Sequence, residues 1–206
     1  MNHQIVKNIL CQIGEAVCEK VITSLKEQSI EVLSSVHKEA AADTIYQIDK
    51  DVEDIIVPLL KANVDKLGGV FLLAEGIAED TGGLRLPDKK GDISINLIMD
   101  PIDGTRGIMY DKRSAFFLAG AAPAKVAPID LNTKSEQSGK GTLNDIEVAV
   151  MVELPTTRSA YSDTLWAIKG VERGRRAKHL DSGKVSPMPL KPSGAQTIYG
   201  GFGQIS

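Results

Sequence analysis

Six consecutive residues, Asp100-Pro101-Ile102-Asp103-Gly104-Thr105, combine types that can bind both a cation and an anion. We call this segment the acidic turn. Its two carboxylates are oxygen ligands of the kind that hard divalent cations prefer. Gly104 allows close approach of the backbone, and Thr105 can open a helix whose free N–H groups suit an anion such as phosphate. Metal carboxylates beside an anion site are what metal-assisted phosphoryl hydrolysis requires. Taken alone, the segment is equally consistent with a structural turn in which Asp caps a helix.

The chain before the acidic turn predicts two helices. Apolar residues recur about every four positions over residues 4–26, which is the stripe of an amphipathic helix. Residues 29–37 are interpreted as a loop or a brief helix. A second helical pattern begins near Gln47, and Pro58 is expected to kink or interrupt it.

The acidic turn itself is expected at the end of a strand. Alternating apolar residues over 92–99 predict a strand that delivers Asp100 at its C-terminal end. Further strands are predicted over 70–73, 114–121, 146–154 and 164–169, and residues 122–144 are interpreted as a surface excursion. Helices followed by strands predict an α+β fold, a layered α/β sandwich with two N-terminal helices packed on a largely antiparallel sheet.

Composition excludes several classes of protein. The 206 residues are 42% hydrophobic and 25% charged, as in an ordinary globular chain. A net charge of -3 gives no overall attraction to nucleic acid or anionic membrane. The apolar runs are shorter than the roughly 18 residues of a membrane span, and the N-terminus lacks a signal-peptide pattern. We therefore expect a cytoplasmic protein with no nucleic-acid or membrane partner.

Cysteines, histidines and basic residues offer no second site. Cys11 and Cys18 fall about 10 Å apart on one side of the first predicted helix, too far for a disulfide, and are expected to be packed thiols. The histidines show no zinc-ligand spacing. A basic run over residues 173–179 is interpreted as a solvated hairpin rather than a phosphate contact.

The acidic turn resembles the DPIDGT signature of the inositol monophosphatase family, within the lithium-sensitive, magnesium-dependent phosphatase superfamily that has a fructose-1,6-bisphosphatase-like fold. Lys38, the segment Asp43-Thr44-Ile45-Tyr46 and Asp49 precede it in the family's order and at a very similar spacing. Glu75 ends a predicted strand where the family has Gly-Glu-Glu. The resemblance runs from the first helix to about Ser193.

The resemblance implies a set of metal ligands. Glu75 and Asp100 would bind a first Mg²⁺ together with the backbone carbonyl of Ile102. Asp100 and Asp103 would hold a second ion, and Asp43 would assist a third, weaker site. The expected cofactor is therefore two or three Mg²⁺ ions.

The resemblance also implies groups that act on the substrate. Gly104 and Thr105 would offer backbone N–H groups to the phosphate. The hydroxyl of Thr105 would, with Asp49, orient and help deprotonate the attacking water. A simpler interpretation of Asp49 is that it stabilises the start of a helix.

Three departures from the family pattern qualify this prediction. Gly76 stands where the family has a second glutamate, and the nearby acids able to replace it in part are Glu79 and Asp80. Arg106 follows the acidic turn, where it is expected to be solvated rather than to meet a substrate phosphate. The sequence contains no Trp-Asp pair, whose aspartate would complete the second metal site. Residues 1–206 are therefore expected to form the N-terminal α+β half of a sugar-phosphatase-like enzyme, without its C-terminal α/β half. One face of the sheet is then expected to be open and apolar.

The leading functional hypothesis is Mg²⁺-dependent hydrolysis of a small phosphate monoester (a sugar, cyclitol or nucleotide) by a metal-activated water. Alternatives are fructose-1,6-bisphosphatase activity, phosphatase activity on 3′-phosphoadenosine 5′-phosphate, and a non-catalytic metal- or phosphate-binding module if the chain naturally ends at Ser206. A haloacid-dehalogenase-type phosphatase is disfavoured, because its two acids are two positions apart whereas Pro101 and Ile102 intervene here. The family also makes a homodimer plausible.

Overall fold

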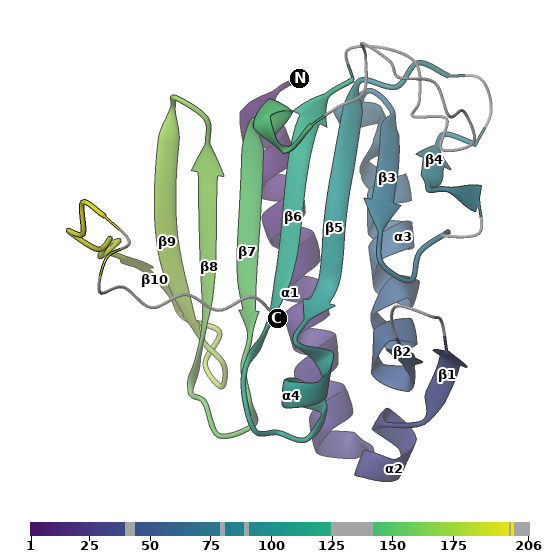
Figure 1. Ribbon diagram of the computed structural model, residues 1–206, viewed down its shortest axis with the longest axis vertical. Coiled ribbons are helices and arrows are strands. Elements are labelled where there is room, and N and C mark those ends of the chain that lie inside the picture. The colour runs from purple at the N-terminus through teal and green to yellow at the C-terminus, as the bar shows by residue number, and fades with distance from the viewer. Residues whose placement is uncertain (40–43, 79–80, 89–90, 125–141, 198, 200–206) are drawn as a thin grey trace.

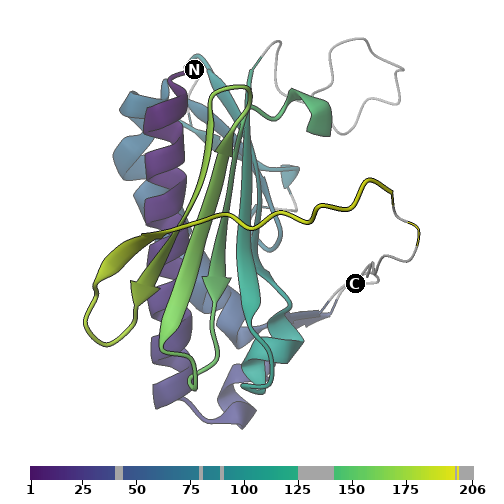
Figure 2. The same ribbon diagram turned by 90° about the vertical axis from the view of Figure 1, so that its left-hand side faces the viewer.

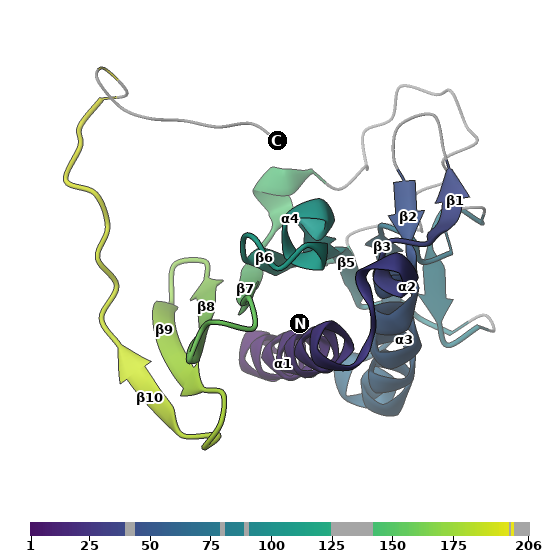
Figure 3. The same cartoon turned by 90° about the horizontal axis from the view of Figure 1, so that it is seen from below.

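The computed structural model describes residues 1–39, 44–78, 81–88, 91–124, 142–197 and 199. Two long helices, α1 (His3–Glu27) and α3 (Gln47–Leu67), lie side by side on one face of an eight-stranded sheet (Figures 1 and 3). The predicted α+β architecture is confirmed. Between the two helices come a short helix, α2 (Ile30–Leu33), and a separate hairpin of β1 (Val36–Glu39) and β2 (Thr44–Tyr46).

The large sheet is antiparallel at every pairing except one. Its order is β10 (Val185–Met188), β9 (Glu172–His179), β8 (Tyr161–Ile168), β7 (Val148–Leu154), β6 (Ala115–Pro123), β5 (Ile95–Asp103), β3 (Val70–Ala74) and β4 (Leu84–Leu86). The exception is the parallel pair β3 and β5. This confirms the prediction of a largely antiparallel sheet.

The helices form where the periodicity places them. Asn2 caps α1, with its side chain accepting a hydrogen bond from the backbone N–H of Ile5. Helix α3 ends at Gly68, whose φ of 72° favours glycine. Pro58 was expected to kink or interrupt α3. It does not interrupt the helix, which continues from Gln47 to Leu67. Because Pro58 has no backbone N–H, the carbonyl of Asp54 has no helical hydrogen bond from it. Both residues are exposed, so water can donate to that carbonyl.

The strands differ from the prediction in extent. Strand β5 continues past Asp100 to Asp103, and β4 and β10 were not predicted as strands. Strand β9 falls in the segment interpreted as a hairpin. Most of the predicted surface excursion over 122–144 lies outside the described residues. At its end, Leu143–Asp145 form a 3₁₀ turn. Among the described helices, none is both long enough and apolar enough to cross a membrane.

The main core lies between the helices and the sheet. Fully buried side chains from α1, α3 and the strands meet there, among them Leu10, Ile56, Phe117 and Val152. Cys11 and Cys18 are free and buried in the same layer, as predicted. Burial raises the pKa of each thiol to about 11.

The opposite face of the sheet, which we call the open face, carries apolar residues that no helix covers within the described part of the chain. A hollow of about 910 Å³ runs over it, and its lining includes Leu73, Ile98, Leu118, Met151 and Leu165. The side chain of Ile98 is 46% exposed. The chain after β10 passes on this side of the sheet, away from the helices (Figure 2). The expected open apolar face is therefore present.

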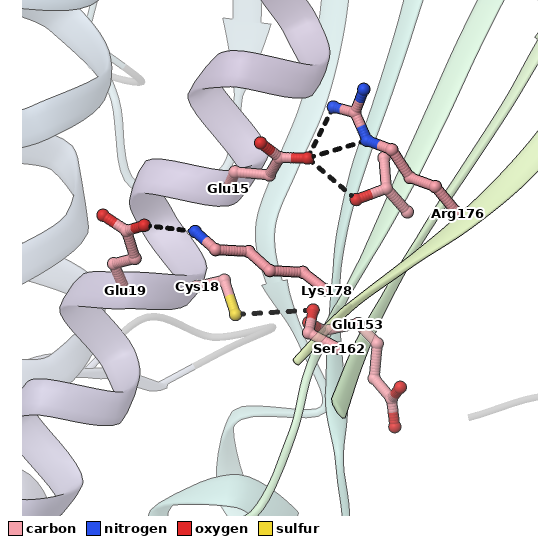
Figure 4. A network of polar contacts seen from close by, with 8 residues as sticks. Glu15, Cys18, Glu19, Glu153, Ser162, Arg176 and Lys178 are labelled. Carbon is pink, nitrogen blue, oxygen red and sulfur yellow. Dashed lines mark hydrogen bonds and ion pairs between the residues drawn. The ribbon is translucent and has the colours of Figure 1, made fainter. Parts of the chain in front are cut away.

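The basic run lies in the β8–β9 hairpin, as interpreted, but it is not simply solvated, which corrects that part of the sequence interpretation. It forms β9, and two of its residues pair with acids on α1 (Figure 4). Glu15 Oε1 accepts hydrogen bonds from Arg176 Nε at 3.1 Å and Nη2 at 2.5 Å. Glu19 Oε1 lies 2.5 Å from Lys178 Nζ, and this hydrogen bond raises the pKa of the ammonium. These pairs attach the β8–β9 side of the sheet to the first helix.

Candidate active site

The parallel pair β3 and β5 brings two predicted acids to one edge of the sheet. Ala74 is paired with Met99, so that Glu75 and Asp100 follow at the same level. The backbone N–H of Glu75 donates to the carbonyl of Met99 at 3.3 Å, which fixes this alignment. Parallel strands present their C-terminal ends at a common edge, where ligand sites are usual in such sheets.

Asp49 and Thr105, 56 positions apart in sequence, are in direct contact. Thr105 Oγ1 lies 3.1 Å from Asp49 Oδ1. The other carboxylate oxygen, Oδ2, accepts the backbone N–H of Tyr46 at 2.8 Å and so caps α3. One carboxylate oxygen thus stabilises the start of α3, which is the simpler interpretation of Asp49, and the other oxygen faces Thr105.

The hydroxyl of Thr105 has two acceptors and one proton. Besides Asp49 Oδ1, the carbonyl oxygen of Ile102 lies 2.9 Å from Thr105 Oγ1. Because a hydroxyl carries a single hydrogen and two lone pairs, it can donate fully to only one of them. When it donates to Asp49 Oδ1, a lone pair of Thr105 is left to accept a hydrogen bond from another group.

The acidic turn contains a β-bulge. Asp100 is paired with Leu118 and Asp103 with Phe116, so three steps along β5 span two along β6. Asp100 Oδ1 accepts the backbone N–H of Ile102 at 3.1 Å, which folds the carboxylate back over the turn. Gly104, with φ of 98°, then begins α4 (Thr105–Met109). Contrary to the prediction, the strand does not end at Asp100 but continues through the bulge to Asp103.

The structure gathers most of the predicted residues around one small pocket of about 20 Å³. Its lining is Asp49, Glu75, Gly76, Asp100, Pro101, Ile102 and Thr105. Asp103 and Gly104 belong to the same turn but do not line this pocket. Asp43, Glu79 and Asp80 lie outside the described residues.

The donor chemistry of the pocket fits a hard cation. Its acids and the carbonyl of Ile102 supply only oxygen, and a pocket of this volume has room for one water-sized guest. Over the described residues, however, no three His, Cys, Asp or Glu side chains are gathered closely enough to hold a metal ion. The residues therefore match a hard cation by ligand type, and the ion itself belongs to the proposal below.

Arg106 is exposed but is not merely solvated. Its Nε donates to the hydroxyl oxygen of Tyr46 at 3.2 Å. With the contact between Thr105 and Asp49, this bond ties α4 to the start of α3. Sequence reasoning missed this contact, and it also missed Glu53, whose place four residues after Asp49 puts it on the same side of the helix.

Comparisons with known proteins identify the fold. No protein-family model and no curated protein matches the sequence. Solved structures do match: fructose-1,6-bisphosphatase of Leishmania major in its holo form, with a TM-score of 0.60 and 12% identity, over 87% of this chain and 52% of that one. The extragenic suppressor protein SuhB of Bartonella henselae matches with a TM-score of 0.53 and 20% identity, over 85% of this chain and 52% of that one.

These likenesses confirm the suspected resemblance at the level of the fold. At such low identity they establish the arrangement of helices and strands and nothing finer. The chain spans about half the length of the solved structures that it matches.

Proposed function

We propose that this chain is the N-terminal half of a phosphatase that uses Mg²⁺ to hydrolyse a small phosphate monoester. The fold shared with fructose-1,6-bisphosphatase and SuhB supports the reaction class. The observation that carries the proposal is the contact of Thr105 with Asp49, beside the edge where Glu75 and Asp100 arrive together. A threonine hydroxyl held against a carboxylate, next to cation-binding oxygens, suits the activation of water for attack on phosphorus.

In this mechanism the protein positions water and receives its proton. The water oxygen bonds to phosphorus as the bond from phosphorus to the ester oxygen breaks, and the leaving alkoxide takes up a proton. Thr105 Oγ1 accepts a hydrogen bond from the water, and Asp49 Oδ1 takes the proton that the threonine passes on. The backbone N–H groups of Gly104 and Thr105 hold the phosphate oxygens. Bound Mg²⁺, held by Glu75, Asp100, Asp103 and the carbonyl of Ile102, would neutralise charge and lower the pKa of the water.

The open face supports the proposal that a further half completes the enzyme. Glu75 and Asp100 line both the small pocket and the large apolar hollow. A layer packed on the open face would therefore also close over the site and help to select the substrate. The predicted cytoplasmic location and homodimer stay predictions.

Phosphate release tests the activity. A panel of sugar, cyclitol and nucleotide monophosphates, with fructose 1,6-bisphosphate and 3′-phosphoadenosine 5′-phosphate, is assayed with and without Mg²⁺ on the natural full-length gene product. Thr105→Ala is expected to lower kcat about a hundredfold or more, because it removes the group that orients the water. Thr157→Ala is a matched control: its hydroxyl also donates to an aspartate, Asp111 at 2.7 Å, but outside the site. Equal activity of Thr105→Ala and wild type would contradict the mechanism.

A second candidate, a non-catalytic module that binds a metal or phosphate, is favoured by one observation. The described residues gather no three ligating side chains at one point, so the set of metal ligands that hydrolysis would use is incomplete among them, whereas binding of a phosphate does not need that set. Turnover of no panel member, with Mg²⁺ still bound, would establish that candidate instead.

A further inference from the structure

A fourth acid, Glu53 of α3, lies next to Gly76, which lines the candidate site. It lies one turn after Asp49, so both project from the same side of the helix. Its side chain is only 15% exposed. One oxygen, Oε2, accepts a hydrogen bond from Lys50 Nζ at 2.7 Å. The other, Oε1, is buried and has no hydrogen-bond partner within the described part of the chain.

The unpaired oxygen points at Gly76, the residue next to Glu75. A Cβ atom added at Gly76 would lie 2.7 Å from Glu53 Oε1, so the carboxylate occupies the space that a side chain there would need. Gly76 also has a φ of 76°, which disfavours any other residue. Because Gly76 lines the small pocket, Glu53 places its carboxylate directly behind the wall of the site.

A buried carboxylate oxygen of this kind lowers the stability of the fold unless a hydrogen-bond donor or a cation interacts with it. A buried acceptor without a partner loses its hydration without compensation, and the cost is larger for a charged group. Lys50 satisfies only one of the two oxygens. A buried carboxylate oxygen without a hydrogen-bond partner, beside a pocket lined by Asp49, Glu75 and Asp100, suits a role as a donor to a bound cation.

We propose that Glu53 completes the oxygen-donor set of this site, in place of the side chain that residue 76 lacks. Its Oε1 would accept from the cation or from a water bound to it. The inference rests on the proposed function, since it assigns a further residue to the same cation site. It differs from the sequence expectation, which looked to Glu79 or Asp80 for a replacement carboxylate.

Direct measurement of cation binding tests this assignment. Binding of Mn²⁺, as a paramagnetic substitute for Mg²⁺, is measured by electron paramagnetic resonance without substrate. Glu53→Gln, which keeps the side-chain shape, is expected to weaken binding about tenfold or more, as the loss of a supporting carboxylate typically does. Asp54→Asn is the matched control, because Asp54 is an exposed acid on the same helix and should bind Mn²⁺ like wild type.

A second variant separates cation binding from a purely structural ion pair. If Glu53 acts only through Lys50, then Glu53→Gln and Lys50→Met should lower the Tm of the metal-free protein equally, with no change in Mn²⁺ affinity. The proposal instead expects Lys50→Met to bind Mn²⁺ at least as tightly as wild type, because a nearby positive charge is gone.

The outcomes distinguish the two proposals. Wild-type binding that Glu53→Gln leaves unchanged overturns the role of Glu53 and leaves the proposed function standing. No Mn²⁺ binding by wild type overturns both. If a variant fails to fold, a measurement on wild type alone still tests the inference. The side-chain carboxyl ¹³C resonance of Glu53 is expected to shift during a Mg²⁺ titration. A resonance that does not shift would overturn the inference.

Discussion

The two faces of the sheet carry similar side chains but have different surroundings. On β7, Val148, Val150 and Val152 are buried under α1, whereas Ala149 between them is exposed and Met151 is half-buried. An antiparallel sheet with one wet face normally alternates apolar with polar residues. Strands β6 and β7 place apolar residues on both faces instead, which is the pattern of a sheet covered on both sides. The comparison shows that burial in this chain is set by which layer is present, and not by residue type alone.

The largest expected effect separates two neighbouring residues on opposite faces. Phe117→Ala should lower the free energy of unfolding by about 3–5 kcal/mol, because it opens a cavity in the fully buried layer. Leu118→Ala, on the open face, should cost less than about 1 kcal/mol in this chain. Urea denaturation of both variants measures the difference. Equal losses would mean that the open face is covered in solution.

The thiols of the covered face predict a smaller effect that depends on pH. Burial raises the pKa of Cys11 and Cys18 from 9.0 to about 11. As pH rises, the thiols ionise in the unfolded chain before they ionise in the folded one, and this favours unfolding. The stability that the protonated thiols contribute is therefore complete below pH 9 and is lost as pH rises toward 11. Between pH 8 and pH 10 the two thiols together account for a loss of roughly 2–3 kcal/mol of unfolding free energy. The double variant Cys11→Ala/Cys18→Ala should show a correspondingly flatter fall in unfolding free energy, and an unchanged slope would contradict the burial of these groups.

The smallest effect is expected at the edge of the covered face. Glu15 and Arg176 are both partly exposed, so removing their ion pair should cost about 1 kcal/mol. A double-mutant cycle of Glu15→Gln and Arg176→Gln measures the coupling energy. The ion pair of Lys7 and Glu172 serves as the comparison. Its Nζ and Oε1 atoms lie 3.2 Å apart and Glu172 is more exposed than Glu15, so this pair should couple more weakly. Equal coupling in the two cycles would argue against the tighter contact of Glu15.

Much of the fold and part of the site could be predicted from the sequence. Both long helices follow from their apolar periodicity, and the contact of Asp49 with Thr105 follows from the family resemblance. The ion pairs between strand β9 and α1 could not be predicted, because the charged residues of β9 look solvated until their partners, about 160 positions away, are known. Glu53 was missed for a related reason: its significance depends on a glycine that approaches it only in the folded chain.

The parallel pairing of β3 with β5 predicts which parts of this chain tolerate insertions and deletions. Adding one residue within 70–75 or 95–100 would slide one carboxylate past the other by about 3.3 Å and turn it to the opposite side of the sheet. Natural variants of this chain should therefore keep these two stretches at constant length, and changes of length should gather in the connections between strands.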